Sequence, residues 1–91
     1  ENLSGINGIR LLQAPPQCTS NYWLQTILLE DTEQRDDVLA ALNEAGYMSR
    51  PVWTGLHKLK PFEKCPRMEM KVTDMLEKRI INLPSSAFLC D

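Results

Sequence analysis

The side chains that could do chemistry gather in the segment Trp53-Thr54-Gly55-Leu56-His57-Lys58-Leu59. His57 is the only histidine of the chain, and imidazole can transfer a proton or bind a metal near neutral pH. A metal site needs several ligands, and no cluster of histidine, cysteine and carboxylate side chains surrounds His57 in the sequence. A triad of residues that meet only in space stays open. By spacing alone, His57 is more often a structural or surface residue than a catalytic one, although a loop position favours function.

Tryptophans and nearby cations could contact a ligand. Trp23 and Trp53 could each stack on a sugar or a base, but tryptophans usually anchor the core of a small domain. We expect Trp23 to lie in the core and leave the role of Trp53 open. Arg50, Lys58 and Lys60 could meet a phosphate, since arginine suits bidentate contacts and lysine acts as a point charge. A solvated rim is the more common role of such residues.

Composition limits the classes of protein that the chain can represent. Its 91 residues form one small domain, and a formal net charge of −2 with scattered cations does not predict a nucleic-acid partner. The chain has no apolar run long enough to span a bilayer. Cys18, Cys65 and Cys90 are odd in number and far apart, which favours reduced thiols in a cytoplasmic protein over disulfides or a zinc site.

The first half of the chain predicts one strand and one helix. Residues 1–20 contain glycines and the pair Pro15-Pro16, and we interpret them as a linker that includes a short extended piece. Residues 22–29 are almost continuously apolar, which predicts a central strand buried on both faces. Asp31 is placed to cap a helix that ends at Gly46.

The second half predicts two more strands, a long loop and a second helix. The expected order is a short strand over residues 47–50, a loop over residues 52–67, a helix whose apolar face contains Val72, Met75 and Leu76, and a last strand over residues 80–83. The fold class is therefore α+β, with helices on one face of a small antiparallel sheet.

Three segments in series carry a family resemblance over essentially the whole chain. They are Cys18-Thr19-Ser20-Asn21-Tyr22-Trp23-Leu24, the Trp53–Leu59 segment, and Cys65-Pro66-Arg67-Met68 leading to Ile81-Asn82-Leu83-Pro84-Ser85-Ser86. Together they resemble the C-terminal domain of the DegT/DnrJ/StrS aminotransferases, and most closely the LegC-like and perosamine-synthase-like branch. The resemblance implies the small domain of a fold-type I enzyme that uses pyridoxal phosphate.

The resemblance also implies a reaction and a division of labour. Such enzymes pass an amino group from glutamate to a keto-sugar carried on a nucleotide, in surface-glycan or nonulosonic-acid biosynthesis. Residues 1–20 would lead from an N-terminal domain, and residues 21–91 would form the small domain of a cytoplasmic homodimer. The lysine that anchors the cofactor would lie in that N-terminal domain, because no lysine here sits in its motif. The fragment alone would then bind no cofactor and be inactive.

The resemblance implies that part of the long loop faces the nucleotide-sugar. Trp53, His57 and Lys58 are its substrate-binding candidates, and His57 matches a histidine that family members often keep. Ser20, Asn21 and Arg50 are weaker candidates for the same surface. Gly55 departs from the pattern, since many relatives carry a bulkier apolar residue there.

Two hypotheses from other classes remain beside the aminotransferase. The element order also suits a stand-alone ferredoxin-like module with a ligand-binding or regulatory role. A third hypothesis is an interaction domain whose Trp53 loop docks a partner.

Overall fold

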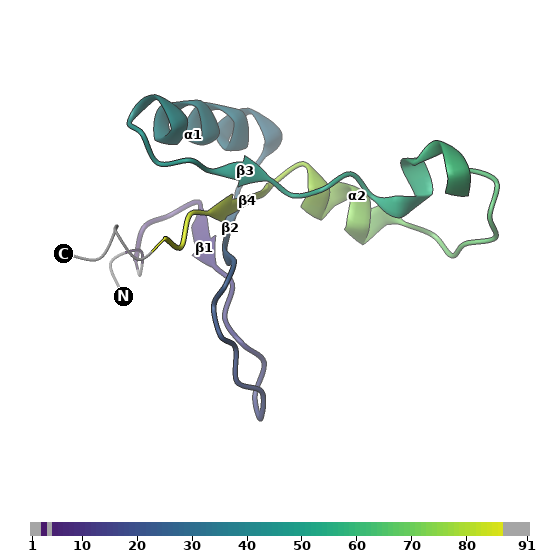
Figure 1. Cartoon of the computed structure of the whole chain (residues 1–91), viewed down its shortest axis with the longest axis horizontal. Coiled ribbons are helices and arrows are strands. Elements are labelled where there is room, and N and C mark those ends of the chain that lie inside the picture. The colour runs from purple at the N-terminus through teal and green to yellow at the C-terminus, as the bar shows by residue number, and fades with distance from the viewer. Residues whose placement is uncertain (1–2, 4, 87–91) are drawn as a thin grey trace.

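A four-stranded antiparallel sheet forms the centre of the protein (Figure 1). The computed structural model describes residue 3 and residues 5–86. The strands are β1 (Ile9–Leu11), β2 (Gln25–Leu29), β3 (Arg50–Pro51) and β4 (Ile80–Leu83), in the spatial order β1-β2-β4-β3. The α-helices are α1 (Thr32–Glu44) and α2 (Lys71–Glu77), and 3-10 turns span Leu56–Lys58 and Lys60–Phe62. The expected α+β class is confirmed.

The core lies where β2 pairs with β4. Ile27 stands opposite Ile81 in the register, and these two side chains and Leu29 are almost fully buried. Successive side chains of a strand point to opposite faces, so these residues share one face. From α1, Val38 and Leu39 pack against that face, which explains the apolar spacing in the helix.

Helix α1 begins and ends at the residues that the sequence indicates. The Oδ1 atom of Asp31 accepts a hydrogen bond from the backbone N–H of Gln34 at 2.8 Å, which satisfies a donor that the first turn leaves free. Gly46 follows the helix with a φ of +91°, a left-handed conformation that glycine adopts without steric cost. Both predictions are confirmed.

The expected buried strand over residues 22–29 is corrected at its start and in its burial. β2 begins at Gln25, and burial alternates along it, so it is central but not buried on both faces. Tyr22 has a φ of +51°, which takes the backbone out of an extended conformation. Trp23 is 73% exposed, so the prediction that it lies in the core is wrong.

Both edge strands also differ from expectation. β1 lies within the segment interpreted as a linker, and it pairs with β2, so this part of residues 1–20 belongs to the sheet. β3 is Arg50–Pro51 rather than residues 47–50. Pro51 is tolerated there because β3 is an edge strand and one side of it needs no ladder hydrogen bond. β4 spans residues 80–83, as predicted.

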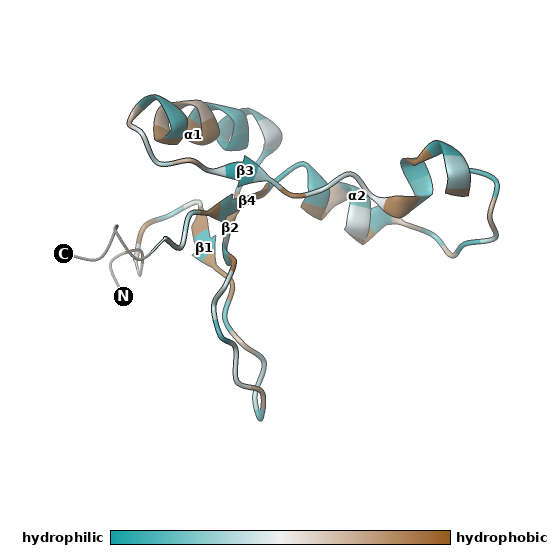
Figure 2. Cartoon of the chain, viewed as in Figure 1, coloured by the Kyte–Doolittle hydropathy of each residue, from teal (hydrophilic) through white to brown (hydrophobic). Residues whose placement is uncertain are grey.

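Two protrusions extend from the sheet (Figure 1). One is the hairpin arm between β1 and β2, and the other contains the loop after β3 together with α2. The Cα radius of gyration is 15.0 Å, whereas a compact domain of this length would have about 12 Å. Apolar residues continue along both protrusions (Figure 2). Of the two helices, α1 covers the buried face of the sheet, and α2 lies beside the sheet in one of the protrusions.

The core contact predicts the effect of removing one methyl group. Ile81→Val should lower the free energy of unfolding by about 1 kcal/mol, because Ile81 is fully buried. Ile6→Val removes the same group from a side chain that is 47% exposed and is the matched control. Urea unfolding followed by circular dichroism measures both. Equal effects of the two substitutions would contradict this description of the core.

Candidate functional site

An open groove of about 720 Å³ lies beside β3 and β4. We call it the Trp53 groove, and its walls include Trp23, Met48, Arg50, Trp53, Asn82 and Ser85. The hydroxyl of Ser85 donates a hydrogen bond to the carbonyl oxygen of Trp23 at 2.6 Å, which ties the hairpin arm to the segment after β4. The groove therefore joins three parts of the chain that are far apart in the sequence.

A polar row crosses the sheet at this groove. Arg50 stands opposite Asn82, and Asn82 stands opposite Thr26, so their side chains lie on the face away from Ile81. The hydroxyl of Thr26 donates to Oδ1 of Asn82 at 2.9 Å. Asn82 is 8% exposed, and this hydrogen bond fixes its amide beside the groove. The guanidinium of Arg50 makes one long contact, 3.4 Å from Nη1 to the carbonyl oxygen of Ser49.

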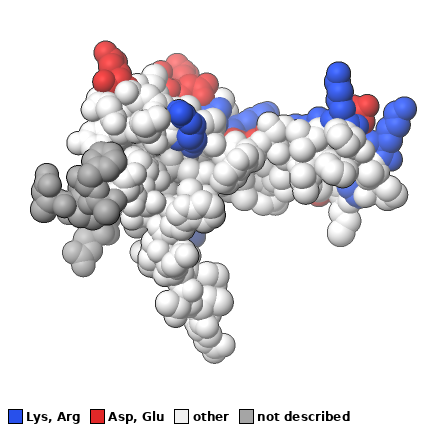
Figure 3. Space-filling view, viewed as in Figure 1, with Lys and Arg blue, Asp and Glu red and all other residues white. Residues whose placement is uncertain are grey.

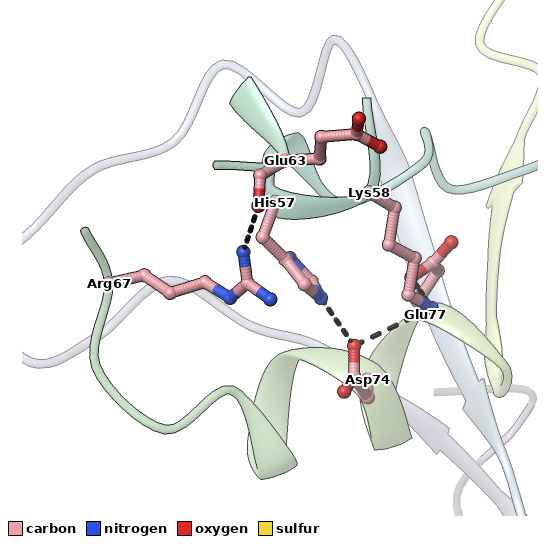
Figure 4. Close-up of polar contacts among 6 residues, drawn as sticks. All are labelled: His57, Lys58, Glu63, Arg67, Asp74 and Glu77. Carbon is pink, nitrogen blue, oxygen red and sulfur yellow. Dashed lines mark hydrogen bonds and ion pairs between the residues drawn. The ribbon is translucent and has the colours of Figure 1, made fainter. Parts of the chain in front are cut away.

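His57 and Lys58 lie in a charged cluster between the loop and α2 (Figure 4). We call it the loop–helix cluster; its members are His57, Lys58, Asp74 and Glu77. Nε2 of His57 donates to Oδ1 of Asp74 at 2.8 Å, because a carboxylate can only accept. Nζ of Lys58 lies 2.8 Å from Glu77 and 3.5 Å from Asp74. The side chain of His57 is 9% exposed, so its ring is part of the packing between loop and helix.

Gly55 is required by the position of the imidazole. A Cβ atom at this residue would lie 2.7 Å from Cε1 and 2.9 Å from Nδ1 of His57, closer than real contacts allow. The carboxylate of Glu77 lies on the same side, 3.5 Å from that Cβ position, and the backbone of Gly55 is one cause of the lowered pKa of Glu77. The departure from the family pattern at Gly55 therefore has a physical reason, since a side chain there would displace the ring.

The cluster shifts the pKa values of its charged members. The hydrogen bond from His57 is the main cause that lowers the pKa of Asp74. The hydrogen bond from Lys58 lowers the pKa of Glu77, and the same bond raises the pKa of Lys58. All three shifts favour the charged forms, so the cluster is held by ion pairs near neutral pH.

Ser20 and Asn21 shape the turn that precedes β2. Oγ of Ser20 accepts from the backbone N–H of Tyr22 at 3.0 Å, and Oδ1 of Asn21 accepts from that of Trp23 at 3.1 Å. Such local bonds are typical of serine and asparagine in turns. These two hydrogen bonds fix the turn that precedes Trp23, whose side chain lines the Trp53 groove.

The structure brings the candidate residues together in pairs rather than in one site. Trp53 and Arg50 line the Trp53 groove, His57 and Lys58 belong to the loop–helix cluster, and Ser20 lines a separate cavity of about 420 Å³ on the arm. Sequence reasoning missed Asp74, Glu77 and Asn82. The carboxylates Asp74 and Glu77 are three residues apart on one helix face, which is the signal that could have pointed to them.

Other kinds of site find no support within the part of the chain that the structure describes. That part holds no group of three or more side chains able to bind a metal. Neither of its helices is long and apolar enough to cross a membrane. Acidic side chains gather over α1, and both basic and acidic side chains lie at the end of the loop protrusion (Figure 3). Cys18 and Cys65 are exposed and unpaired, and Cys90 lies outside the described residues.

Comparison with known proteins identifies one family. The family model for the DegT/DnrJ/EryC1/StrS aminotransferase family matches residues 1–91. No individual curated protein matches the chain. The resemblance drawn from the sequence motifs is thus confirmed at the level of the family.

The contact of Gly55 with His57 predicts a coupled pair of substitutions. Gly55→Ala should destabilise the protein by about 1–3 kcal/mol, because the new methyl group overlaps the imidazole. In a His57→Ala background the same change should cost much less, since the overlapping ring is gone. Thermal unfolding of the single and double variants gives the coupling. Additive effects of the two substitutions would argue against the contact.

The ion pairs predict how stability depends on pH. Asp74 and Glu77 have lowered pKa values, so their contribution is present above their ordinary values of 3.8 and 4.5 and is lost as pH falls further. The contribution of Lys58, whose pKa is raised from 10.5, is lost only as pH rises above that value. The stability difference between the wild type and Asp74→Asn should therefore be present at neutral pH and shrink towards acidic pH. Urea unfolding across this range measures it.

The control for this pH dependence is Asp37→Asn, because Asp37 is an exposed aspartate on α1 outside the cluster. Its effect on stability should be small and should not follow the same pH course. A difference for Asp74→Asn that is unchanged from neutral to acidic pH would refute the role of the charged carboxylate.

Proposed function

Because the chain belongs to the DegT/DnrJ/EryC1/StrS aminotransferase family, we propose that it is the C-terminal small domain of an enzyme that aminates a nucleotide-linked keto-sugar. Glutamate is the proposed amino donor, and pyridoxal phosphate is the cofactor. The observation that carries the proposal is the family match over residues 1–91. The motif resemblance adds the LegC-like and perosamine-synthase-like branch, and with it surface-glycan or nonulosonic-acid biosynthesis by a cytoplasmic homodimer.

The described residues do not fit the covalent anchor of the cofactor. An anchoring lysine must lose its proton, which burial or a neighbouring cation favours. Lys58 is instead paired with Glu77 and Asp74, and its pKa is raised. The walls of the Trp53 groove contain Arg50 but no lysine among the residues described. We therefore assign the anchor to another part of the enzyme.

The contribution of this chain is to bind and orient the substrate. Trp53 and Arg50 both line the Trp53 groove, and they offer an apolar ring and a permanent positive charge. His57 and Lys58 belong to the same substrate-facing loop and hold it against α2. Ser20 and Asn21 set the turn that leads into Trp23, which lines the same groove as Trp53. The family match favours this role over that of a stand-alone regulatory module.

The test is transamination by the intact protein that contains this chain. With pyridoxal phosphate, glutamate and a panel of nucleotide-linked keto-sugars, it should form an amino-sugar nucleotide and 2-oxoglutarate, which mass spectrometry detects. The isolated 91-residue chain should form neither product, because it lacks a suitable lysine. Product formed by the isolated chain would overturn the assignment of the anchoring lysine to another part of the enzyme. Failure of the intact protein on the whole panel would overturn the proposed substrate class.

A further inference from the structure

We propose that the Trp53 groove is a binding site for an aromatic ring that carries a phosphate, and that it takes the nucleotide end of the substrate. Trp53 is the stacking surface, Arg50 meets the phosphate, and the amide of Asn82 meets the edge of the ring. The choice of a nucleotide rests on the proposed function, whereas the chemistry of the ligand rests on the groove itself.

Two indole rings are left open to solvent at the walls of this groove. Trp53 is 71% exposed and Trp23 is 73% exposed, although indole is among the most favourable groups to bury. Exposed aromatic rings on a cavity wall are platforms on which flat ligands stack. The groove, with a volume of about 720 Å³, falls in the range of small-molecule sites.

The polar groups of the groove match an anion and a ring edge. Arg50 presents a guanidinium with several N–H donors, and its one contact within the protein is long. Asn82 is more than nine-tenths buried, and its Oδ1 is taken by Thr26, so its NH2 donors remain for a ligand. Because Arg50 and Asn82 are register partners on adjacent strands, the sheet fixes the spacing of their Cα atoms and places both side chains on the same face.

The loop–helix cluster holds the stacking surface in place. Gly55, two residues after Trp53, is packed against the ring of His57 and lies near the carboxylate of Glu77. Trp53 also lines a second, smaller cavity of about 220 Å³ with Leu76 of α2 and Ile80. One side of the Trp53 segment thus faces α2 across this cavity, and its other side borders the groove. His57 acts through this segment as a positioning residue.

Two sources supply an aromatic ring bearing a phosphate, namely a nucleotide and the pyridoxal cofactor. We assign the groove to the nucleotide because no lysine lines it among the residues described. Uridine 5′-monophosphate represents the first source, and pyridoxamine 5′-phosphate, which has no aldehyde, represents the second. Uridine and ribose 5-phosphate separate the contribution of the ring from that of the phosphate.

The experiment is a calorimetric titration of the intact protein with each of these compounds. Uridine 5′-monophosphate should bind more tightly than either uridine or ribose 5-phosphate. Trp53→Ala should weaken its binding about tenfold or more, since a stacked ring is lost, and Trp53→Phe should retain most of it. Arg50→Gln should remove the advantage of the nucleotide over uridine. Arg10→Gln, at the far edge strand, is the matched control and should change nothing.

A positioning role for His57 needs its own measurement. In a Trp23→Phe background, where Trp53 is the remaining tryptophan of this chain, the emission of Trp53 should shift when His57 is replaced by alanine. His57→Ala should also weaken nucleotide binding, and His57→Gln should restore part of both, because its amide can still donate to Asp74. Unchanged emission and affinity in His57→Ala would overturn the positioning role.

Other outcomes overturn the main proposal. Tighter binding of pyridoxamine 5′-phosphate that depends on Trp53 would assign the groove to the cofactor. Equal affinity of the wild type and Trp53→Ala for the nucleotide would show that the groove does not hold it. Because these titrations measure binding and need no turnover, their result is independent of the transamination test. Nucleotide binding without transamination would refute the proposed reaction alone, and transamination that is insensitive to Trp53 would refute the site alone.

Discussion

The contact between Ile27 and Ile81 across β2 and β4 is the constraint on which the rest of the structure depends. β1 and β3 attach to the outer edges of this pair, and α1 packs over its buried face. The opposite face of the same pairing carries Thr26 and Asn82 into the groove. A shift of one residue in the register would exchange the two faces. Core and candidate site are therefore two sides of one strand pairing.

Local signals in the sequence were sufficient for the elements that they define. The cap at Asp31, the left-handed Gly46 and the strand over residues 80–83 each depend on a few neighbouring residues. Burial depends on what the folded chain places opposite a residue. Trp23 was assigned to the core from its type, yet the turn set by Ser20 and Asn21 leaves it at the wall of a groove.

The candidate site could be predicted only in part for the same reason. The loop that contains His57 was recognisable from its residue types, and its neighbour Trp53 does line the Trp53 groove. The partners of the loop are 17 and 19 residues away on α2. The spacing of Asp74 and Glu77 places them on one helix face, but it does not indicate that this face meets the loop. Gly55 departs from the family pattern because the imidazole of His57 leaves no room for a side chain at this position.

The pairing of β2 with β4 joins residues that are distant in the sequence, since Thr26 and Asn82 are 56 positions apart. Closing a loop of that length costs about 3.5 kcal/mol of chain entropy in the simplest polymer estimate. Helix α1, with its cap and its i to i−4 bonds, needs only near neighbours and can form early. The pairing of β2 with β4 requires the whole intervening chain to be brought back to the sheet. The rate of folding of this domain should therefore be limited by this long-range pairing rather than by helix formation.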